Sequence, residues 1–267
     1  MTDRTIRLFH VSDIHFGMED AVALEWVRQC IETERPDAVA ITGDLTMRAR
    51  HGEYEAAVEW ISGLGVPVTV EVGNHDLPYF NLFERLTDPY RRFRGIKGLI
   101  EREIDLPGLA VVSLRTTARV QPRWPWVDGW IMPGALGETL AAIDALPPGT
   151  RVVVAAHHPL PERGEAGRLL TRGGAQAMQA LAARGVLAVL SGHIHDPFDL
   201  VGQTAQGPLR MIGAGTLSRR VRSTPPSFNE IVIRGREVRV EARNRADVAT
   251  AEMMVDAIPE DVAPPSH

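Results

Sequence analysis

The sequence predicts an α/β protein in which helices cover mixed β-sheets. In the first half of the chain, short apolar runs rich in β-branched residues alternate with segments of helical period, which is the βαβαβ pattern of a layered sheet. Towards the C-terminus the apolar runs follow one another without long helices between them, which favours antiparallel strands. These two observations indicate either one long mixed sheet or two sheets.

The first half supplies three strands and two helices. Strands are predicted over residues 6–11, 37–42 and 67–72. Val22, Trp26 and Cys30 recur at helical spacing after the first strand, and Tyr54 and Ile61 mark a second amphipathic helix after the second strand. The single cysteine, Cys30, therefore falls on a helix, where we expect a small buried apolar side chain.

The segment over residues 77–133 is less regular. It contains several prolines and is expected to form loops around two strands, at residues 102–106 and 110–114. Three tryptophans lie in it, and they either pack an irregular segment or stack on a substrate. These are Trp124, Trp126 and Trp130.

Regular alternation resumes after residue 133 and gives way to a tail. Helices are predicted over 134–146 and 175–183, and strands over 152–156, 187–190, 209–212, 229–233 and 238–242. We expect one domain over residues 1–245. The tail over residues 246–267 contains Pro259, Pro264 and Pro265 and is expected to be loosely ordered.

Length and composition are those of a globular, enzyme-sized domain. The 267 residues are 44% hydrophobic and 24% charged, close to the averages for such proteins. The formal charge of -5 argues against nucleic acid as a partner. One cysteine excludes an intrachain disulfide, no apolar stretch approaches the roughly 20 residues that span a bilayer, and the N-terminus has no signal-peptide pattern. We therefore expect a cytoplasmic protein without a membrane span.

Five of the predicted strands end in residue types that bind metals. The blocks are Asp13-Ile14-His15, Gly43-Asp44, Gly73-Asn74-His75-Asp76, His157-His158-Pro159 and Gly192-His193-Ile194-His195. In open α/β sheets the carboxyl ends of strands face the ligand crevice, so these five ends can converge. A single block of this kind is more often a turn or a hydrogen-bonded pair. Independent turns would not share the same chemistry at the same topological position, so the set predicts a metal centre.

Together the blocks D-x-H, G-D, G-N-H-D, H and G-H-x-H resemble those of the calcineurin-like metallophosphoesterase superfamily, over about residues 6–196. The resemblance implies a four-layer α/β/β/α sandwich with mixed β-sheets and a dinuclear metal centre. One ion would be held by Asp13, His15 and His195, and the other by Asn74, His157 and His193, with Asp44 bridging both.

The ligand types restrict the cofactor and the reaction. Imidazole and carboxylate without thiolate suit Fe, Mn, Zn or Co, and they do not select among these metals. A bridging carboxylate can hold two divalent or transition-metal ions about 3.5 to 4 Å apart, where they acidify a shared water and clamp the phosphoryl oxygens. The expected nucleophile is therefore hydroxide rather than a side chain.

Further polar residues receive more specific expectations. The resemblance implies that His75 contacts the phosphate and assists the leaving group. Asp76 either orients the His75 ring or caps the segment that starts at Leu77. His10, inside the first strand, is expected to be a hydrogen-bonded core histidine. His157 is preferred to His158 as a ligand because it directly follows the strand, and His158 is expected to line the substrate pocket.

The expected reaction is hydrolysis of a small phosphodiester of the cyclic nucleotide or glycerophosphodiester type, because the Gly-Asp and Gly-Asn-His-Asp blocks are most similar to that branch. A diester also carries a single negative charge, and none of the five blocks contains the Arg or Lys that would suit a monoester dianion. The alternatives are a phosphomonoesterase, a hydrolase of a nucleotide-linked pyrophosphate, and a non-catalytic metal-binding scaffold. The scaffold is disfavoured because every expected ligand position is filled.

Two arginine clusters and the oligomeric state stay open at this point. The clusters either hold an anionic substrate or form solvated faces. They consist of Arg91, Arg92 and Arg94, and of Arg219, Arg220 and Arg222. A homodimer that pairs the antiparallel C-terminal strands is a further hypothesis.

Overall fold

Two five-stranded sheets form the centre of the molecule. The computed structural model describes residues 4–101, 104, 106–120, 127–161 and 171–245. The first sheet has the order β12-β11-β1-β2-β3. Its strands are β1 (Ile6–Val11), β2 (Ala38–Ile41), β3 (Val68–Val70), β11 (Ser227–Arg234) and β12 (Glu237–Asn244). The strands β1, β2 and β3 are parallel, whereas β11 and β12 run antiparallel to their neighbours.

The second sheet repeats this mixed arrangement with the order β4-β6-β8-β10-β9. Its strands are β4 (Leu109–Leu114), β6 (Arg151–Ala156), β8 (Ala188–Ser191), β9 (Phe198–Thr204) and β10 (Gly207–Gly213). The first four strands in this order are parallel, and β9 is the antiparallel edge. A separate parallel pair joins β5 (Gly129–Trp130) to β7 (Thr171–Arg172).

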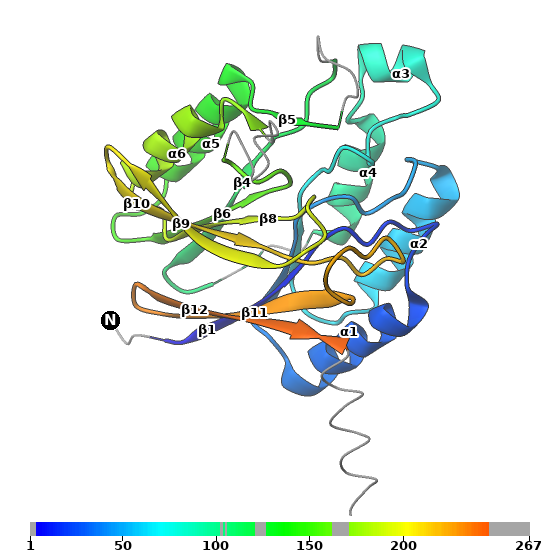
Figure 1. The fold of residues 1–267 in the computed structure, drawn as a ribbon, viewed down its shortest axis with the longest axis horizontal. Helices are drawn as coiled ribbons and strands as arrows, with labels where there is room; N and C mark the ends of the chain where they lie inside the picture. Colours follow the sequence, from blue (N-terminus) through cyan, green and yellow to red (C-terminus); the bar gives the residue numbers. More distant parts are fainter. Residues whose placement is uncertain (1–3, 102–103, 105, 121–126, 162–170, 246–267) are drawn as a thin grey trace, which may run out of the picture.

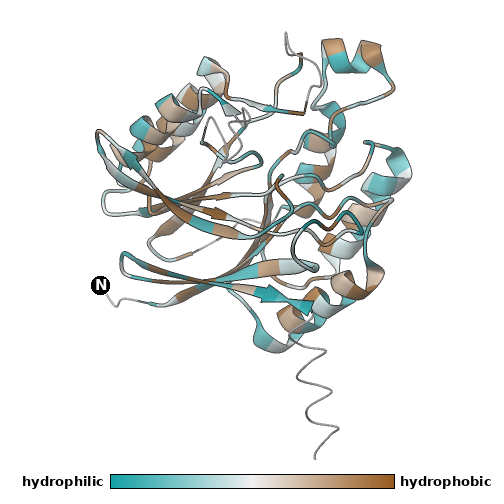
Figure 2. Ribbon diagram, viewed as in Figure 1, coloured by the Kyte–Doolittle hydropathy of each residue, from teal (hydrophilic) through white to brown (hydrophobic). Residues whose placement is uncertain are grey.

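Helices cover the outer faces of both sheets, as Figure 1 shows. The helices of the described residues are α1 (Ala21–Glu34), α2 (His51–Ser62), α3 (Leu82–Thr87), α4 (Arg91–Ile100), α5 (Pro133–Asp144) and α6 (Gly174–Ala182), and α3 lies apart from both sheets in Figure 1. The helices α1, α2 and α4 pack on the first sheet, and α5 and α6 pack on the second. The predicted four-layer α/β/β/α sandwich is therefore confirmed. Figure 2 shows hydrophobic residues along the central strands, where both faces of each sheet are covered.

The sequence of β1 explains how one strand serves two cores. Successive side chains of a strand point to opposite faces, so Phe9 and Val11 pack against the helices while Ile6 and Leu8 pack between the sheets. All four side chains are fully buried. Full burial of such a side chain contributes roughly 1.5 to 3 kcal/mol, so β1 is a main source of stability for the sandwich.

Local sequence also sets the ends of the helices. The Asp20 side chain accepts hydrogen bonds from the backbone N–H groups of Val22 and Ala23 and so caps the start of α1. Pro133 is the first residue of α5. Proline has no backbone N–H, and at this position an N–H would make no hydrogen bond within the helix, so proline costs nothing there. None of the helices that the structure describes has the length and apolar character needed to cross a bilayer.

The middle of the chain differs from the expectation of loops around two strands. Helices α3 and α4 form there, and the strand expected over residues 110–114 is part of β4. The strand predicted over residues 102–106 is not formed at its described residues, Ile104 and Leu106, which belong to no strand. Trp124, Trp126 and residues 246–267 lie outside the described residues. Trp130 lies in β5, and the Arg172 guanidinium stacks 4.5 Å from the centroid of its ring.

Two single residues complete the comparison. His10 is fully buried, and its ring nitrogens lie 3.0 Å from Thr42 Oγ1 and 3.3 Å from Asn229 Nδ2, so the prediction of a hydrogen-bonded core histidine is confirmed. The expectation for Cys30 is wrong in part, because its thiol is only half-buried and lies 3.5 Å from the Arg243 guanidinium.

Candidate metal centre

The five predicted blocks meet at one edge of the sandwich, where the carboxyl ends of β1, β2, β3, β6 and β8 lie together. Backbone hydrogen bonds join the loops: Asp13 N donates to Gly43 O at 3.1 Å, and His15 N donates to Asp44 O at 2.9 Å. The two sheets are joined as well, because the His157 Nδ1 atom lies 2.8 Å from Thr42 O. The site therefore lies on the seam between the sheets.

A first cluster contains the side chains of Asp13, His15 and His195, and all three are buried. The Nε2 atoms of His15 and His195 face each other at 3.2 Å, and Asp13 Oδ1 lies 3.2 Å from His195 Nε2. Asp13 Oδ1 is nevertheless a buried atom without a hydrogen-bond partner among the described residues. Two imidazole nitrogens and a carboxylate oxygen directed at one point form a donor set that suits a transition metal.

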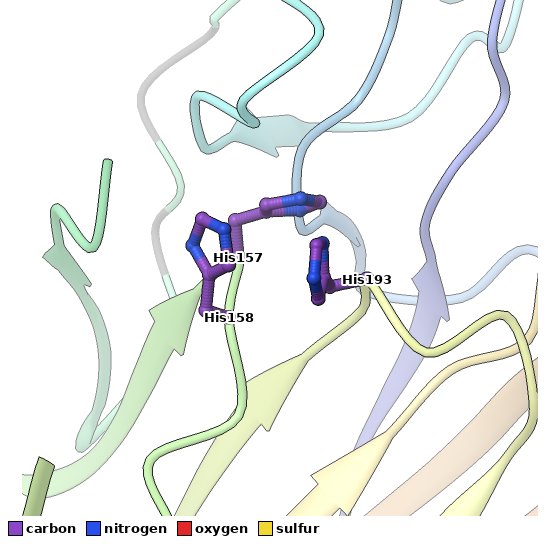
Figure 3. Close-up of side chains that lie close together, drawn as sticks. All are labelled: His157, His158 and His193. Atoms are coloured by element: carbon purple, nitrogen blue, oxygen red, sulfur yellow. The ribbon is translucent and has the colours of Figure 1, made fainter. Parts of the chain in front are cut away.

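A second cluster lies beside the first and contains Asn74, His157 and His193. The His157 Nε2 atom lies 3.1 Å from Asn74 Oδ1. The His157 and His193 rings have centroids 5.3 Å apart and, together with His158, form the group of rings shown in Figure 3. His157 and His158 follow β6, and His193 follows β8. An amide oxygen and two imidazoles thus converge from three loops.

His158 belongs to this group of rings but has other partners. Its Nδ1 atom lies 2.8 Å from Thr116 Oγ1, and its Nε2 atom lies 3.0 Å from Val127 O. Both ring nitrogens are therefore engaged, and the side chain is fully buried. A role of His158 at the substrate pocket stays a prediction, and its ring lies beside those of His157 and His193.

Asp44 lies between the two clusters. Its Oδ1 atom is 3.5 Å from His157 Nε2, and its Oδ2 atom is 3.8 Å from His15 Nε2. The carboxylate thus turns one oxygen towards each cluster. Gly73 makes this close approach possible: a Cβ atom at position 73 would lie 2.1 Å from Asp44 Oδ1.

The backbone at the strand ends is unusual. Five of the clustered residues have a positive φ between 51° and 69°, the left-handed region that most residues other than glycine avoid. They are Asp13, His15, Asp44, His193 and His195. These conformations occur directly after β1, β2 and β8, where the chain leaves the sheets and the side chains meet in the site.

The two buried carboxylates make this place favourable for positive charge. Burial by itself would lower the pKa of His157, but the charge of Asp44 and its contact outweigh burial and raise the pKa to about 9. Burial likewise opposes ionisation of Asp13, yet the His195 ring and the His157 charge hold its pKa below the ordinary value. Burial and the positive charge of His157 lower the pKa of His193 to about 3.

His75 reaches the same site from the loop after β3. Its backbone N–H donates to Asp44 Oδ1 at 2.8 Å, and its Nδ1 atom lies 2.7 Å from Met47 O. The carbonyl accepts the Nδ1 proton, so Nε2 is the ring atom directed at the site. His75 thus lies beside the ligand candidates, as the sequence predicted. Its Nε2 atom makes no hydrogen bond to any of them.

Asp76 does not orient the His75 ring, and that interpretation is wrong. Its Oδ1 atom accepts hydrogen bonds from the Thr46 backbone and hydroxyl at 2.9 and 3.0 Å, and its Oδ2 atom accepts from Gly73 N at 2.9 Å. Asp76 thus connects the loops after β2 and β3. The alternative, a turn-forming Asp before the segment that starts at Leu77, agrees better with the structure, because His75 and Asp76 lie in a turn.

Arg220 is the residue whose place the sequence left open. Its Nη1 atom lies 3.3 Å from His15 Nε2 and 3.3 Å from His75 Nε2. None of the five blocks contains an arginine, as the sequence showed, but Arg220 reaches the clusters from outside the blocks, so the argument from the blocks for a diester over a monoester no longer holds. A signal was present: the chain reaches Arg220 from the carboxyl end of β10, the same kind of strand end that carries the five blocks.

A comparison with known protein families identifies the family to which the chain belongs. A family model described as calcineurin-like phosphoesterase matches residues 6–197. The chain belongs to the calcineurin-like phosphoesterase family. The predicted resemblance, over about residues 6–196, is confirmed, and the buried His and Asp clusters of this calcineurin-like phosphoesterase are those of a candidate dimetal site.

Relatives of this calcineurin-like phosphoesterase include one named as a probable enzyme and one named as probably inactive. A probable cyclic nucleotide phosphodiesterase of Synechococcus sp. is 26% identical over 213 residues, which cover 73% of this chain and 75% of the relative. A probable inactive purple acid phosphatase 28 of Arabidopsis thaliana is 32% identical over 99 residues, only 28% of this chain and 24% of the relative.

Solved structures share the fold at low sequence identity. A dimetal phosphatase from Danio rerio matches with a TM-score of 0.59 and 14% identity, over 88% of this chain and 98% of that chain. A purple acid phosphatase from yellow lupin matches with a TM-score of 0.63 and 12% identity, over 92% of this chain and 52% of that chain. These likenesses support the sandwich architecture of the calcineurin-like phosphoesterase described here.

Proposed function

We propose that the chain is a dimetal phosphodiesterase in which Asp13, His15 and His195 hold one ion, Asn74, His157 and His193 hold the other, and Asp44 is shared. The observation that carries the proposal is the position of Asp44, with one carboxylate oxygen directed at each cluster. A carboxylate placed in this way could bind both ions, so the two clusters would form a single dinuclear centre.

The residues present fit two transition-metal ions. Both clusters consist of nitrogen and oxygen donors without sulfur, which suits Fe, Mn, Zn or Co. The buried Asp13 Oδ1 atom has no hydrogen-bond partner among the described residues and faces the His195 ring, as a ligand atom would. When bound, the ions supply Lewis acidity at the phosphoryl oxygens and acidify water.

The chain's own groups orient the ligands and move the proton. The Thr42 and Arg220 carbonyls lie 2.8 Å from His157 Nδ1 and 2.7 Å from His195 Nδ1, so the Nε2 atoms of both rings turn to the site. As an imidazolium, whose Nδ1–H donates to the Met47 carbonyl, His75 is placed to give its Nε2 proton to the departing oxygen.

A small phosphodiester of the cyclic nucleotide or glycerophosphodiester type is the proposed substrate. The support is the relative named as a probable cyclic nucleotide phosphodiesterase, which shares 26% identity over 73% of this chain. A phosphomonoester is the second candidate, and the observation that favours it is Arg220 beside His75. A nucleotide-linked pyrophosphate receives no support from the described residues.

The test measures metal content and turnover together. Protein loaded separately with Mn, Zn, Fe and Co is assayed against cyclic nucleotides, glycerophosphodiesters and phosphomonoesters, and its metal content is determined by elemental analysis. We expect two ions per chain and turnover of at least one diester. One ion per chain at full activity contradicts the shared role of Asp44, and two ions without turnover of any ester support a non-catalytic scaffold.

A further inference from the structure

Helix α3 has the reverse of the usual burial pattern, because it buries charged residues and exposes apolar ones. Glu84 and Arg85 are only 5% and 6% exposed. Leu82 and Phe83, in contrast, are 59% and 78% exposed, and Leu86 is exposed as well. A helix that packs on a core by its apolar stripe would show the opposite pattern. The apolar side chains of α3 are therefore not what holds this helix to the rest of the protein.

The two buried charges hold α3 instead. The Glu84 carboxylate accepts hydrogen bonds from Arg92 Nε at 2.9 Å and from Arg92 Nη2 at 2.5 Å. The Arg85 guanidinium donates to the Arg119 carbonyl at 2.8 Å and to the Ala118 carbonyl at 3.3 Å. A bidentate pair of arginine and carboxylate fixes the geometry of both groups. Helix α3 thus presents its exposed side chains from a fixed position, apart from both sheets in Figure 1.

The exposed apolar surface continues into the residues before the helix. Tyr79 and Phe80 are both exposed, and their ring centroids lie 5.4 Å apart in a T-shaped arrangement. We call the exposed apolar side chains of this one short segment the α3 patch: Tyr79, Phe80, Leu82, Phe83 and Leu86. A concentration of large apolar side chains on the surface marks a place where a protein binds a partner or a membrane.

Positive charge lies beside the α3 patch. Arg48 and Arg50 are exposed, and the guanidinium carbon of each lies 5.9 Å from the centroid of the Phe80 ring. Among the described residues no carboxylate forms an ion pair with either arginine, whereas Arg94 pairs with Asp88 at 2.6 Å. Aromatic and aliphatic side chains next to unpaired arginines match the chemistry of an anionic lipid surface.

A second copy of the chain matches these observations less well. In a symmetric dimer the same surface is contributed by both subunits. Two α3 patches that met in this way would bring Arg48 and Arg50 of both copies to one interface, without carboxylates to pair with them. Like charges brought together at an interface oppose association.

We propose that the α3 patch, together with Arg48 and Arg50, docks this protein on an anionic lipid surface. The apolar side chains enter the region between headgroups and acyl chains, and the guanidinium groups bind headgroup phosphates. This inference does not depend on the proposed function. Only Leu77 and Pro78 separate the patch from the block that contains His75, so docking holds the end of the molecule with the metal centre near the lipid.

The experiment measures co-sedimentation of the full chain with vesicles over a range of lipid concentrations. The vesicles consist of phosphatidylcholine alone or of an equimolar mixture of phosphatidylcholine and phosphatidylglycerol. Phe83→Ser and Leu82→Ser change the patch. Leu200→Ser is the matched control, because Leu200 is 53% exposed on β9, which lies far from α3 in Figure 1.

A pair of double variants examines the charge. Arg48→Gln with Arg50→Gln removes the two arginines beside the patch. Arg234→Gln with Arg239→Gln is its control, because both arginines are exposed on the hairpin of β11 and β12, across the molecule from α3 in Figure 1. Urea unfolding verifies that each variant is folded, and sedimentation velocity without lipid measures self-association.

The wild type should bind the mixed vesicles, and it should bind phosphatidylcholine alone at least tenfold more weakly. Phe83→Ser is expected to weaken binding about tenfold and Leu82→Ser about fivefold, because each removes apolar surface that enters the lipid. The double variant of Arg48 and Arg50 should weaken binding about 30-fold, since each arginine near an anionic surface contributes about fivefold. Added salt should weaken binding, and both controls should match the wild type.

The proposal is refuted if the wild type binds neither kind of vesicle, or if Phe83→Ser and Leu82→Ser bind like the wild type. Equal affinity for the two kinds of vesicle also overturns it, because the arginines would then contribute nothing. If Phe83→Ser is unfolded, Leu82→Ser decides, because it removes a smaller side chain. A dimer that forms without lipid and is lost in Leu82→Ser, in a chain that binds no vesicle, assigns the patch to a second copy and contradicts the proposal.

Discussion

Acid should unfold this protein partly through one buried histidine, His10, which lies between the two sheets. In the folded protein Asn229 Nδ2 donates to Gly213 O at 2.9 Å and lies 3.3 Å from His10 Nδ1. The amide is therefore fixed with its N–H groups towards the ring, and Nδ1 must accept. The opposite nitrogen, Nε2, donates to Thr42 Oγ1. A protonated ring would set two donors, His10 Nδ1 and the Asn229 amide, against each other.

The size of the effect follows from the shift of the pKa. Burial, only partly offset by the charge of Asp13, lowers the pKa of His10 from 6.5 to about 3. Because the unfolded chain then binds a proton more readily than the folded one, the stability is complete above pH 6.5 and is lost as the pH falls towards 3. Between pH 7 and pH 5 the loss from this residue is about 2 kcal/mol. That is a large part of a typical stability of roughly 5 to 15 kcal/mol.

Urea unfolding followed by tryptophan fluorescence at pH 7, 6 and 5 measures this loss, with a chelator present throughout so that metal release does not contribute. His10→Gln, which does not titrate, should lose about 2 kcal/mol less than the wild type between pH 7 and pH 5. His51→Gln, at an exposed position on α2, is the control. An equal loss in the wild type and His10→Gln would refute the reasoning.

Three further predictions concern the metal centre. Asp44→Ala should reduce metal content and turnover more than any other ligand change, because it removes a donor from both clusters, and near-normal values by elemental analysis and assay would contradict this. His75→Ala should keep the metal but lower turnover by about 10²- to 10⁴-fold for esters with poor leaving groups, and by less for good ones; equal losses would indicate positioning alone. Gly73→Ala should behave like Asp44→Ala in metal analysis because its Cβ would lie 2.1 Å from Asp44 Oδ1, whereas Gly95→Ala, with open space around its Cβ, should bind metal normally.

The sequence predicted the parts of the site that depend on short segments. A buried strand followed at once by Asp13 or His193 is visible in a few residues, because the parallel strand fixes where its carboxyl end lies. Arg220 follows the carboxyl end of β10, which the sequence could indicate, but its loop is held by a hydrogen bond from Thr216 to the Asp13 carbonyl and by one between His195 Nδ1 and the Arg220 carbonyl, and no local pattern shows these bonds. The same holds for the Met47 carbonyl, which holds His75 in place of the predicted Asp76.

The errors in the fold have similar physical causes. Helix α4 buries Phe93 and Ile100 at helical spacing. The arginines around Phe93 make the segment highly charged, which is also typical of an exposed loop. Strand β9 is an edge strand with mostly exposed residues, so it lacks the alternation of apolar and polar residues that marks a half-buried strand. Sequence patterns report burial, and elements that bury little leave a weak signal.

The left-handed backbone at the strand ends lowers the stability of the protein. Each of the five residues with positive φ costs on the order of 1 kcal/mol that glycine would not cost, and together they oppose folding by an amount comparable to a small domain's whole stability. All five are aspartate or histidine, so the residues that carry this cost are also residues that supply donor atoms to the two clusters.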